Sequence, residues 1–199
     1  MGPESPTLAG GGTKAVVAFC LFDFANSAFT TIIITFIFAT YFASGIAVDP
    51  TTGGAQWSFA MAVSGVAIAI LSPVFGSIAD QTRRRKPWIL AVSLICAAAT
   101  ALLWYARPTP EDAPWALVCA VIATVGFEMG MLFYNALLPT VATPVNMGRI
   151  SGWAWGFGYA GGLLSLALAL FVLVQADPVP FGLDKSQAEH VRATSLLAA

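Results

Sequence analysis

The sequence predicts an all-α membrane protein with five transmembrane helices and the start of a sixth. Of its 199 residues, 58% are hydrophobic and 10% are charged, and the mean hydropathy is +0.79. Soluble domains carry roughly a quarter charged residues, and much of any soluble fold faces water, so a chain of this size cannot hide so much apolar surface. The apolar residues also gather in runs of about the 20 residues that a helix needs to cross a lipid bilayer.

Five apolar runs define the expected spans, and a polar tail of residues 1–14 precedes them. The spans cover residues 15–47, 57–79, 88–106, 115–138 and 150–174, and a sixth apolar run begins near residue 191. We expect residues 15–199 to form one transmembrane bundle. The sixth run is too short to span a membrane, which predicts a fragment cut inside a sixth helix. The alternative is a complete five-helix protein with a short hydrophobic tail.

The distribution of positive charge predicts the orientation. The N-terminal tail, the turn at residues 80–87 and the loop at residues 139–149 fall on one side. That side carries Lys14, Arg83, Arg84, Arg85, Lys86 and Arg149, and the other side carries Arg107, Lys185 and Arg192. Short loops rich in Lys and Arg stay in the cytoplasm. We therefore expect a multi-pass protein of the plasma (inner) membrane with a cytoplasmic N-terminus.

The first span carries a stripe of polar residues at positions Asp23, Asn26, Ser27 and Thr30. Their spacing places them on one face of a helix. Polar groups inside a membrane are costly and mark functional sites by default, so Asp23 and Asn26 are candidates for contact with a substrate or for proton coupling. In the alternative interpretation the stripe packs against other helices, and Asp23 reaches water among the lipid headgroups.

The fourth span contains a second carboxylate, Glu128, near its middle. Thr124, Glu128 and Asn135 share a helical face, and Tyr134 adjoins that face. The expected spans hold no cation that could pair with Glu128, and a low dielectric favours its neutral acid. Glu128, Tyr134 and Asn135 are therefore further candidates for proton coupling or for binding a cationic substrate. The alternative is a protonated Glu128 that hydrogen-bonds a neighbouring helix.

The fifth span is rich in glycine. Gly152 and Gly156, and likewise Gly158 and Gly162, are four residues apart, and small residues at that spacing let helices pack closely. Aromatic residues of the same span could line a cavity or face lipid, and the sequence leaves both possibilities open for Trp153, Trp155 and Tyr159.

Enzymatic and nucleic-acid-binding signals are not found. The single histidine, His190, excludes a histidine-based metal site or catalytic triad. The three cysteines lack metal-site spacing, and residues 10–14 lack the order of a phosphate-binding loop. The sequence therefore predicts no enzyme, no cofactor and no metal, and one short basic turn is not a nucleic-acid-binding face.

One segment resembles a signature of the major facilitator superfamily. Gly76-Ser77-Ile78-Ala79-Asp80, followed by Arg84-Arg85, is similar to the motif Gly-x-x-x-Asp-(Arg/Lys)-x-Gly-Arg-(Arg/Lys) between helices two and three of that family. Gln81 and Arg83 depart from the motif. The resemblance implies that Gly76, Asp80, Arg84 and Arg85 form a conformational latch that braces the cytoplasmic ends of helices.

Further segments, spread over about residues 19–165, resemble the vacuole-effluxer-like branch of this superfamily. They are residues 22–29 (Phe-Asp-Phe-Ala-Asn-Ser-Ala-Phe), 133–139 (Phe-Tyr-Asn-Ala-Leu-Leu-Pro), 149–151 and 158–162. The fungal members of that branch export amino acids from the vacuole.

The resemblance implies the N-terminal half of a twelve-helix, secondary-active transporter, built from inverted three-helix repeats. Its partners would be the lipid bilayer, a small-molecule substrate held between the halves, and the C-terminal half that this sequence lacks. The glycines of residues 156–162 do not match the antiporter signature of helix five, so they do not indicate antiport, and the sequence leaves uniport, symport and antiport open. A non-transporting scaffold or sensor that reuses the fold is the alternative function.

Overall fold

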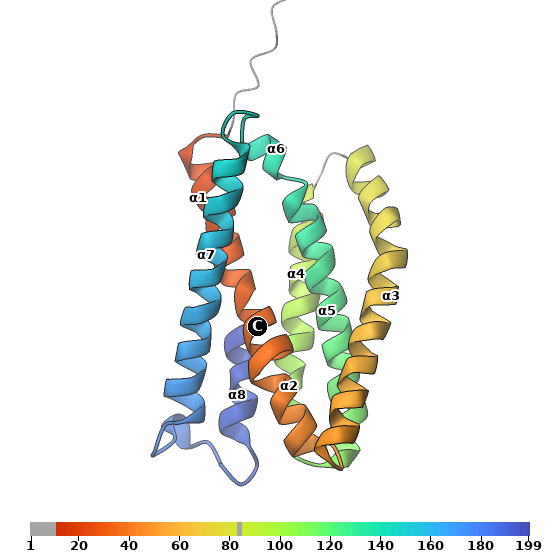
Figure 1. Ribbon diagram of the computed structural model, residues 1–199, viewed down its shortest axis with the longest axis vertical. Coiled ribbons are helices and arrows are strands. Elements are labelled where there is room, and N and C mark those ends of the chain that lie inside the picture. Colours follow the sequence, from red (N-terminus) through yellow and green to blue (C-terminus); the bar gives the residue numbers. More distant parts are fainter. Residues whose placement is uncertain (1–10, 83–84) are drawn as a thin grey trace, which may run out of the picture.

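The computed structural model describes residues 11–82 and 85–199, which form an upright bundle of helices (Figure 1). Within those ranges, five segments are long and apolar enough to cross a membrane. They are Thr13–Ile46, Pro50–Ile78, Arg85–Tyr105, Pro110–Val141 and Met147–Val174. The described part of the chain contains no β-strand. The expected all-α membrane fold is therefore confirmed.

The first segment is continuous but changes helix type along its length. It consists of α1 (Thr13–Ala28), a π-helical stretch η1 (Phe29–Phe36), α2 (Phe38–Tyr41) and a second π-helical stretch η2 (Phe42–Ile46). The first π-helical stretch coincides with a run of β-branched residues at 30–35, which crowd the turns of an α-helix. The Thr35 hydroxyl donates to the carbonyl of Thr30, 2.8 Å away and five residues earlier, and π-helical turns are frequent at functional sites.

The second segment, α3 (Pro50–Thr82), begins well before the apolar run expected at residue 57. Asp49 explains the early start, because its Oδ1 accepts the backbone N–H groups of Thr51 and Thr52, each at 3.0 Å. This is the bonding pattern of a helix N-cap, and it satisfies donors that have no partner within the helix.

The third and fourth segments form a closely packed pair. They are α4 (Arg85–Leu102), which ends in the 3₁₀ turn η3 (Leu103–Tyr105), and α5 (Ala113–Asn135), which follows the 3₁₀ turn η4 (Pro110–Asp112). Gly126 of α5 lies against the backbone of α4: a Cβ atom there would be 3.1 Å from the Val92 carbonyl oxygen. A short helix, α6 (Leu138–Val141), follows Asn135 and leads to the fifth segment.

The fifth segment packs against the first. It consists of α7 (Met147–Leu168) and the π-helical stretch η5 (Ala169–Val174). Gly161 is the point of closest approach, because a Cβ atom there would lie only 2.0 Å from the Phe24 carbonyl oxygen of α1. Of the glycines expected to pack, Gly158 and Gly162 face α1, but Gly152 and Gly156 have no described neighbour within 4 Å of an added Cβ.

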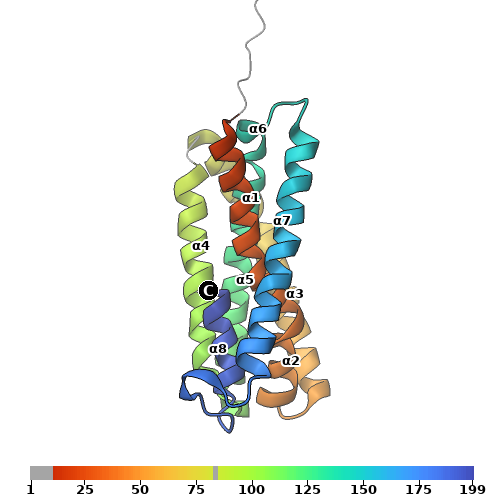
Figure 2. The same cartoon turned by 90° about the vertical axis from the view of Figure 1, so that its left-hand side faces the viewer.

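The chain then returns through a loop containing the 3₁₀ turn η6 (Pro180–Gly182) to α8 (Glu189–Ala198), which lies against α4, η3 and η5 (Figure 2). Arg192 holds α8 in place and is only 5% exposed. Its Nε donates to the Trp104 carbonyl oxygen at 2.6 Å, and its guanidinium lies 4.9 Å from the centre of the Trp104 ring.

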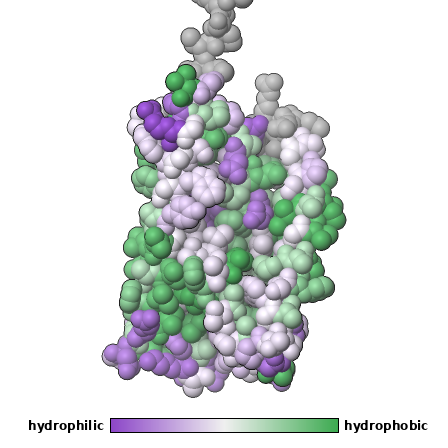
Figure 3. Space-filling view, in the orientation of Figure 1, coloured by the Kyte–Doolittle hydropathy of each residue, from purple (hydrophilic) through white to green (hydrophobic). Residues whose placement is uncertain are grey.

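On the face drawn in Figure 3, apolar side chains gather toward the sides, while hydrophilic residues gather at the two ends and in the middle of the upper half. Exposed apolar residues are most frequent on α7, and α3 also carries a stripe of them that includes Phe59, Val66, Ile70 and Val74. A soluble protein would bury such a stripe, so the surface fits a lipid or protein environment.

Buried apolar residues of the described chain form three clusters, one of which joins α4 to α5 through Val92 and Phe133. A large cluster of buried residues at the end of the bundle near α2 contains Phe38, Phe42 and Trp57, and a smaller one near the N-terminus contains Phe19, Tyr134 and Ile150. The candidate site lies beside the smaller cluster, where α1 and α7 on one side face α5 on the other.

Candidate functional site

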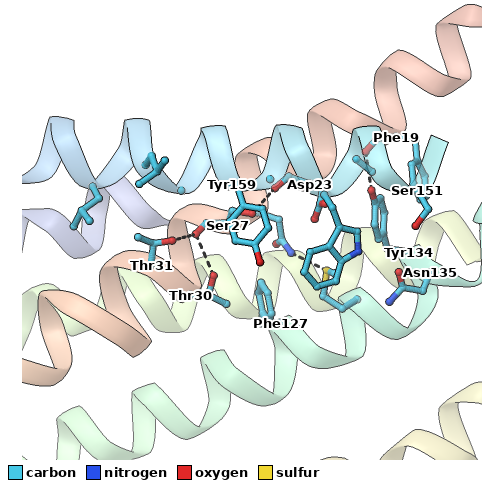
Figure 4. Close-up of a pocket in the computed structure, with 18 of the residues that line it drawn as sticks. Phe19, Asp23, Ser27, Thr30, Thr31, Phe127, Tyr134, Asn135, Ser151 and Tyr159 are labelled. Atoms are coloured by element: carbon cyan, nitrogen blue, oxygen red, sulfur yellow. Dashed lines mark hydrogen bonds between the residues drawn. The ribbon is translucent and has the colours of Figure 1, made fainter. Parts of the chain in front are cut away.

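A pocket of about 410 Å³ lies between the first segment, α5 and α7. Figure 4 shows its polar side chains converging from those three helices. The first segment contributes Phe19, Asp23, Asn26, Ser27, Thr30, Thr31 and Phe36; α5 and α6 contribute Phe127, Met131, Tyr134, Asn135 and Leu138; and α7 contributes Ser151, Ala154, Trp155, Gly158, Tyr159, Gly162, Leu163 and Leu166. A volume of this size suits a small solute.

Asp23 is the ionisable carboxyl group of this lining. Its side chain is partly buried and faces α7, where a Cβ atom on Gly158 would lie 3.0 Å from Asp23 Oδ2. The absence of a side chain on Gly158 therefore leaves room for the carboxylate. Within the described part of the chain, the Asp23 carboxylate accepts no hydrogen bond and forms no ion pair. A polar group in that position is available to a ligand.

The hydroxyl groups near Asp23 donate to carbonyls of their own helix. Ser27 Oγ donates to the Asp23 carbonyl at 2.8 Å, and Thr31 Oγ1 donates to the Ser27 carbonyl at 2.9 Å. Thr30 Oγ1 also donates to the Ser27 carbonyl, at 3.2 Å. Because each hydroxyl has a single proton, what remains for a ligand is the acceptor capacity of the oxygen.

Asn26 joins the first segment to α5. Its Nδ2 lies 3.2 Å from Met131 Sδ and donates to that sulfur. This contact agrees with the interpretation of the amide as a link between helices, while its position in the lining keeps its carbonyl oxygen within reach of the pocket.

Tyr134 forms a rigid wall at the end of the pocket nearest the N-terminus. Its ring stacks on Phe19 with centroids 4.1 Å apart and on Phe22 with centroids 4.9 Å apart. Its hydroxyl donates to the Phe19 carbonyl at 3.0 Å. The hydroxyl proton is thus already engaged in holding α5 against α1.

The structure brings four of the predicted candidates together. Asp23, Asn26, Tyr134 and Asn135 all line the pocket. Glu128 does not; it lies exposed on α5, and among the described residues its carboxylate has no hydrogen-bond or ion-pair partner. The roles assigned to these five residues stay predictions.

Sequence reasoning missed several lining residues, including Thr31, Ser151, Phe127 and Met131. Thr31 lies one position outside the spacing used to define the stripe, and the others carry no signal in a single apolar helix. Of the aromatic residues left open, Trp155 and Tyr159 line the pocket. Trp153 does not, and the Arg149 guanidinium lies 5.2 Å from the centre of its ring.

Comparison with known proteins identifies the family. The family model described as Major Facilitator Superfamily matches residues 5–166, which is most of the sequence. The chain belongs to the major facilitator superfamily. It is a multi-pass integral membrane protein of a transporter family, as the apolar helices already indicated.

A curated relative agrees with this assignment. The chain is 28% identical over 175 residues to an uncharacterized MFS-type transporter, YxiO, of Bacillus subtilis (strain 168). The match covers 84% of this chain but 40% of the relative, so the chain spans less than half of that protein's length. No solved structure matches the chain. Neither match extends to the vacuole-effluxer-like branch.

The superfamily signature is only partly within the described residues. Arg84 lies outside them, as does the side chain of Asp80. Arg85 begins α4, and its Nη1 donates to the Ala136 carbonyl at the end of α5. Gly76 lies in α3, where an added Cβ would meet no described atom within 4 Å. The latch assignment to these four residues therefore stays a prediction.

The described residues contain no group of three or more His, Cys, Asp or Glu side chains that could hold a metal ion. The three cysteines, Cys20, Cys96 and Cys119, are buried free thiols.

Proposed function

We propose that this chain forms the N-terminal half of a secondary-active transporter that moves a small solute, with amino acids as the substrate class, by alternating access. One observation carries the proposal. A solute-sized pocket with an unpartnered carboxylate, Asp23, opens between membrane-spanning helices of a chain from a transporter superfamily. Polar groups inside a membrane-spanning bundle mark solute or ion pathways. The motifs similar to the vacuole-effluxer-like branch support the choice of amino acids.

Within this proposal, the pocket residues contact the solute near the middle of the membrane. Asp23, Asn26, Tyr134 and Asn135 lie on its wall, and the C-terminal half of the same transporter would close the opposite side. Glu128 lies on the same helix as Tyr134 but outside the pocket, which suits a proton-coupling group better than a substrate contact.

The proposed orientation places the N-terminus in the cytoplasm of a cell whose plasma (inner) membrane holds the protein. Positive charge at one end of the bundle supports this orientation. The first turns of α1, α4 and α7 lie at that end and carry Lys14, Arg85, Lys86 and Arg149. Positive residues at this density favour the cytoplasmic side. At that end, Arg85 and its bond to Ala136 would brace helices in one of the alternating states.

Counterflow in proteoliposomes tests the proposed function. The full-length protein is reconstituted into vesicles loaded with unlabelled amino acids, and entry of the labelled amino acid is followed. The proposal predicts entry that is faster than in protein-free vesicles and that depends on the internal amino acid. Entry no faster than in protein-free vesicles for all amino acids would exclude them as the substrate class.

The coupling role has its own test. We expect Glu128→Gln to abolish the acceleration of uptake by a proton gradient while leaving gradient-independent counterflow in place, because a neutral amide cannot carry a proton. Uptake by Glu128→Gln that keeps its full dependence on the proton gradient would remove Glu128 from the coupling mechanism.

A further inference from the structure

We propose that the pocket between the first segment, α5 and α7 selects organic cations and holds their ammonium group beside Asp23. This inference rests on the proposed function and names the chemistry of its substrate. An amino acid satisfies it through the ammonium group, and an amine without a carboxylate satisfies it fully.

The described lining of the pocket has one negatively charged group and no positively charged one. Asp23 contributes a carboxylate, and none of the described lining residues is Lys, Arg or His. Two described cations at the same end of the bundle as Tyr134 have other contacts: Arg149 lies over the Trp153 ring, and Arg85 donates to Ala136. The charge of Asp23 is thus unopposed within the described half, and a ligand cation would supply the missing partner.

The hydrogen-bonding groups carry the second step. Ser27, Thr30 and Thr31 direct their only protons to backbone carbonyls, and Tyr134 directs its proton to Phe19. The amide of Asn26 donates to Met131 and leaves its oxygen open. Asn26 keeps a second N–H group, so this part of the wall offers mainly acceptors, which match the N–H donors of an ammonium group better than the oxygens of a carboxylate.

Aromatic rings carry the third step. Trp155 and Tyr159 both line the pocket from α7, with ring centroids 5.9 Å apart, and Phe127 lines it from α5. The face of an aromatic ring attracts a cation within about 6 Å of its centre. These rings add to the same lining as Asp23 groups that favour a cation and do not favour an anion.

The remaining lining fixes the shape of the ligand. Phe36, Leu163 and Leu166 line the pocket farther along the first segment and α7, beyond the hydroxyl groups. A ligand with an ammonium group at one end and an apolar group at the other would satisfy both parts, and about 410 Å³ accommodates a single-ring amine.

Calorimetric titration of the purified full-length transporter tests the charge preference. Phenethylamine and 3-phenylpropionate serve as the two probes, because each joins a phenyl ring to an ionised group of opposite sign. The proposal predicts that phenethylamine binds and that 3-phenylpropionate binds at least about tenfold more weakly. No binding of the amine, or equal binding of the two probes, would overturn the proposal.

Variants then locate the binding. We expect Asp23→Asn to weaken phenethylamine binding about tenfold or more, since the amide keeps the shape but loses the charge. Glu111→Gln, which removes an exposed carboxylate outside the pocket, should leave the affinity unchanged. Equal affinities of Asp23→Asn and Glu111→Gln, with both proteins folded, would place the cation elsewhere and overturn the proposal.

A second variant keeps the proposal testable if Asp23→Asn does not fold. Tyr159→Leu should weaken phenethylamine binding severalfold by removing a ring face, whereas unchanged affinity would contradict the proposed aromatic contribution. If the protein binds the amine but does not exchange amino acids, amino acids are excluded as the transported class and the cation preference is supported. If the protein exchanges amino acids but does not bind the amine, the cation preference is overturned and the proposed function is kept.

Discussion

Tyr134 shows how single side chains hold the pocket open. It is buried, stacks on Phe19 and Phe22, and its hydroxyl reaches the backbone of α1. These contacts fix the separation of α1 and α5 at one end of the pocket, while Gly158 leaves space for Asp23 on the α7 side. Rigid aromatic contact beside an unpartnered carboxylate is an arrangement that keeps a polar cavity from collapsing.

We expect Tyr134→Phe to lower the free energy of unfolding by about 1 kcal/mol, because the ring contacts remain and one buried hydrogen bond is lost. Thermal unfolding in detergent measures the change. Tyr105→Phe is the matched control, since Tyr105 is 61% exposed and its hydroxyl has no described partner. Equal melting temperatures of the two variants would show that the Tyr134 hydroxyl contributes nothing.

At the scale of elements, the bundle consists of two tightly packed groups. The first segment packs along α7, while α5 packs along α4 and α3, and α8 joins the groups at the end near α2. The pocket lies between the groups, which touch beside it where Tyr134 stacks on Phe19 and Asn26 donates to Met131. Two glycines, Gly161 and Gly126, mark the close contacts within the groups, and a larger residue at either would push the helices apart.

The α1–α7 contact gives a sharp prediction at this scale. We expect Gly161→Ala to destabilise the protein by about 1–3 kcal/mol, because the added methyl group would overlap the Phe24 carbonyl. Gly156→Ala adds the same methyl group on the same helix, where no described atom lies within 4 Å, and should not destabilise the protein. The comparison is a pair of detergent melting curves, and a Gly161→Ala protein as stable as Gly156→Ala would refute the packing described for α7.

The start of α3 gives a pH-dependent prediction. The side-chain hydroxyl of Thr52, followed by its backbone N–H and that of Thr51, holds the pKa of Asp49 below its usual range. A carboxyl whose pKa is lower in the folded state stabilises the fold fully above its unfolded pKa, and this contribution disappears as the pH falls through the folded pKa. The first turn of α3 should therefore loosen on acidification below the ordinary pKa of Asp.

Hydrogen exchange of the amides of residues 51–54 measures this loosening. Exchange rates are first corrected for the intrinsic rate of each amide at each pH. After that correction, we expect these amides to exchange faster at neutral pH in Asp49→Ala than in the parent protein, which should show such fast exchange only in acid. Identical protection of these amides in Asp49→Ala and the parent protein would mean that Asp49 does not cap α3.

At the scale of the whole molecule, the charges and the family place the bundle in a membrane. Described cations begin α1, α4 and α7 at one end, and the acidic residues Asp49, Glu111 and Asp112 lie at the other. Since Lys and Arg decide orientation, the end with the N-terminus is expected in the cytoplasm. The pocket then lies on the cytoplasmic side of the large apolar cluster that contains Phe38 and Trp57.

Reporter fusions in a bacterial host test this orientation. Alkaline phosphatase, which is active only outside the cytoplasm, should be active when fused after Pro108 and inactive when fused after Val145. A green fluorescent protein fused at the same positions should give the reverse pattern. Phosphatase activity after Val145 and none after Pro108 would invert the proposed topology.

The sequence predicted the bundle well because bilayer thickness dictates the length of each apolar run. It predicted the start of α3 less well, because that start depends on Asp49 capping a polar turn and not on apolar residues. Helical spacing identified the Asp23 stripe, which reaches the pocket as expected for a polar face. Helical spacing could not show whether Glu128 lines the pocket, because the angle between neighbouring helices determines which of two adjacent helix faces meets the cavity.

Helical spacing also could not show which glycines of α7 pack against α1. A spacing of four residues made Gly152 and Gly156 as plausible as Gly158 and Gly162, yet only the second pair faces α1. Both pairs satisfy the local rule, and the position at which α1 crosses α7 selects between them. Spacing within one helix carries no information about that crossing point.

The central claim is that the pocket between the first segment, α5 and α7 is a water-accessible solute site. Alkylation by a membrane-impermeant maleimide tests it most directly, in full-length protein whose native cysteines are replaced. Thr30 lines the pocket, whereas Leu164 is exposed on α7 outside it and serves as the control. The account predicts that Thr30→Cys reacts with the maleimide, that Leu164→Cys reacts far more slowly, and that a transported solute slows only the former. Equally slow labelling at both positions would contradict the account.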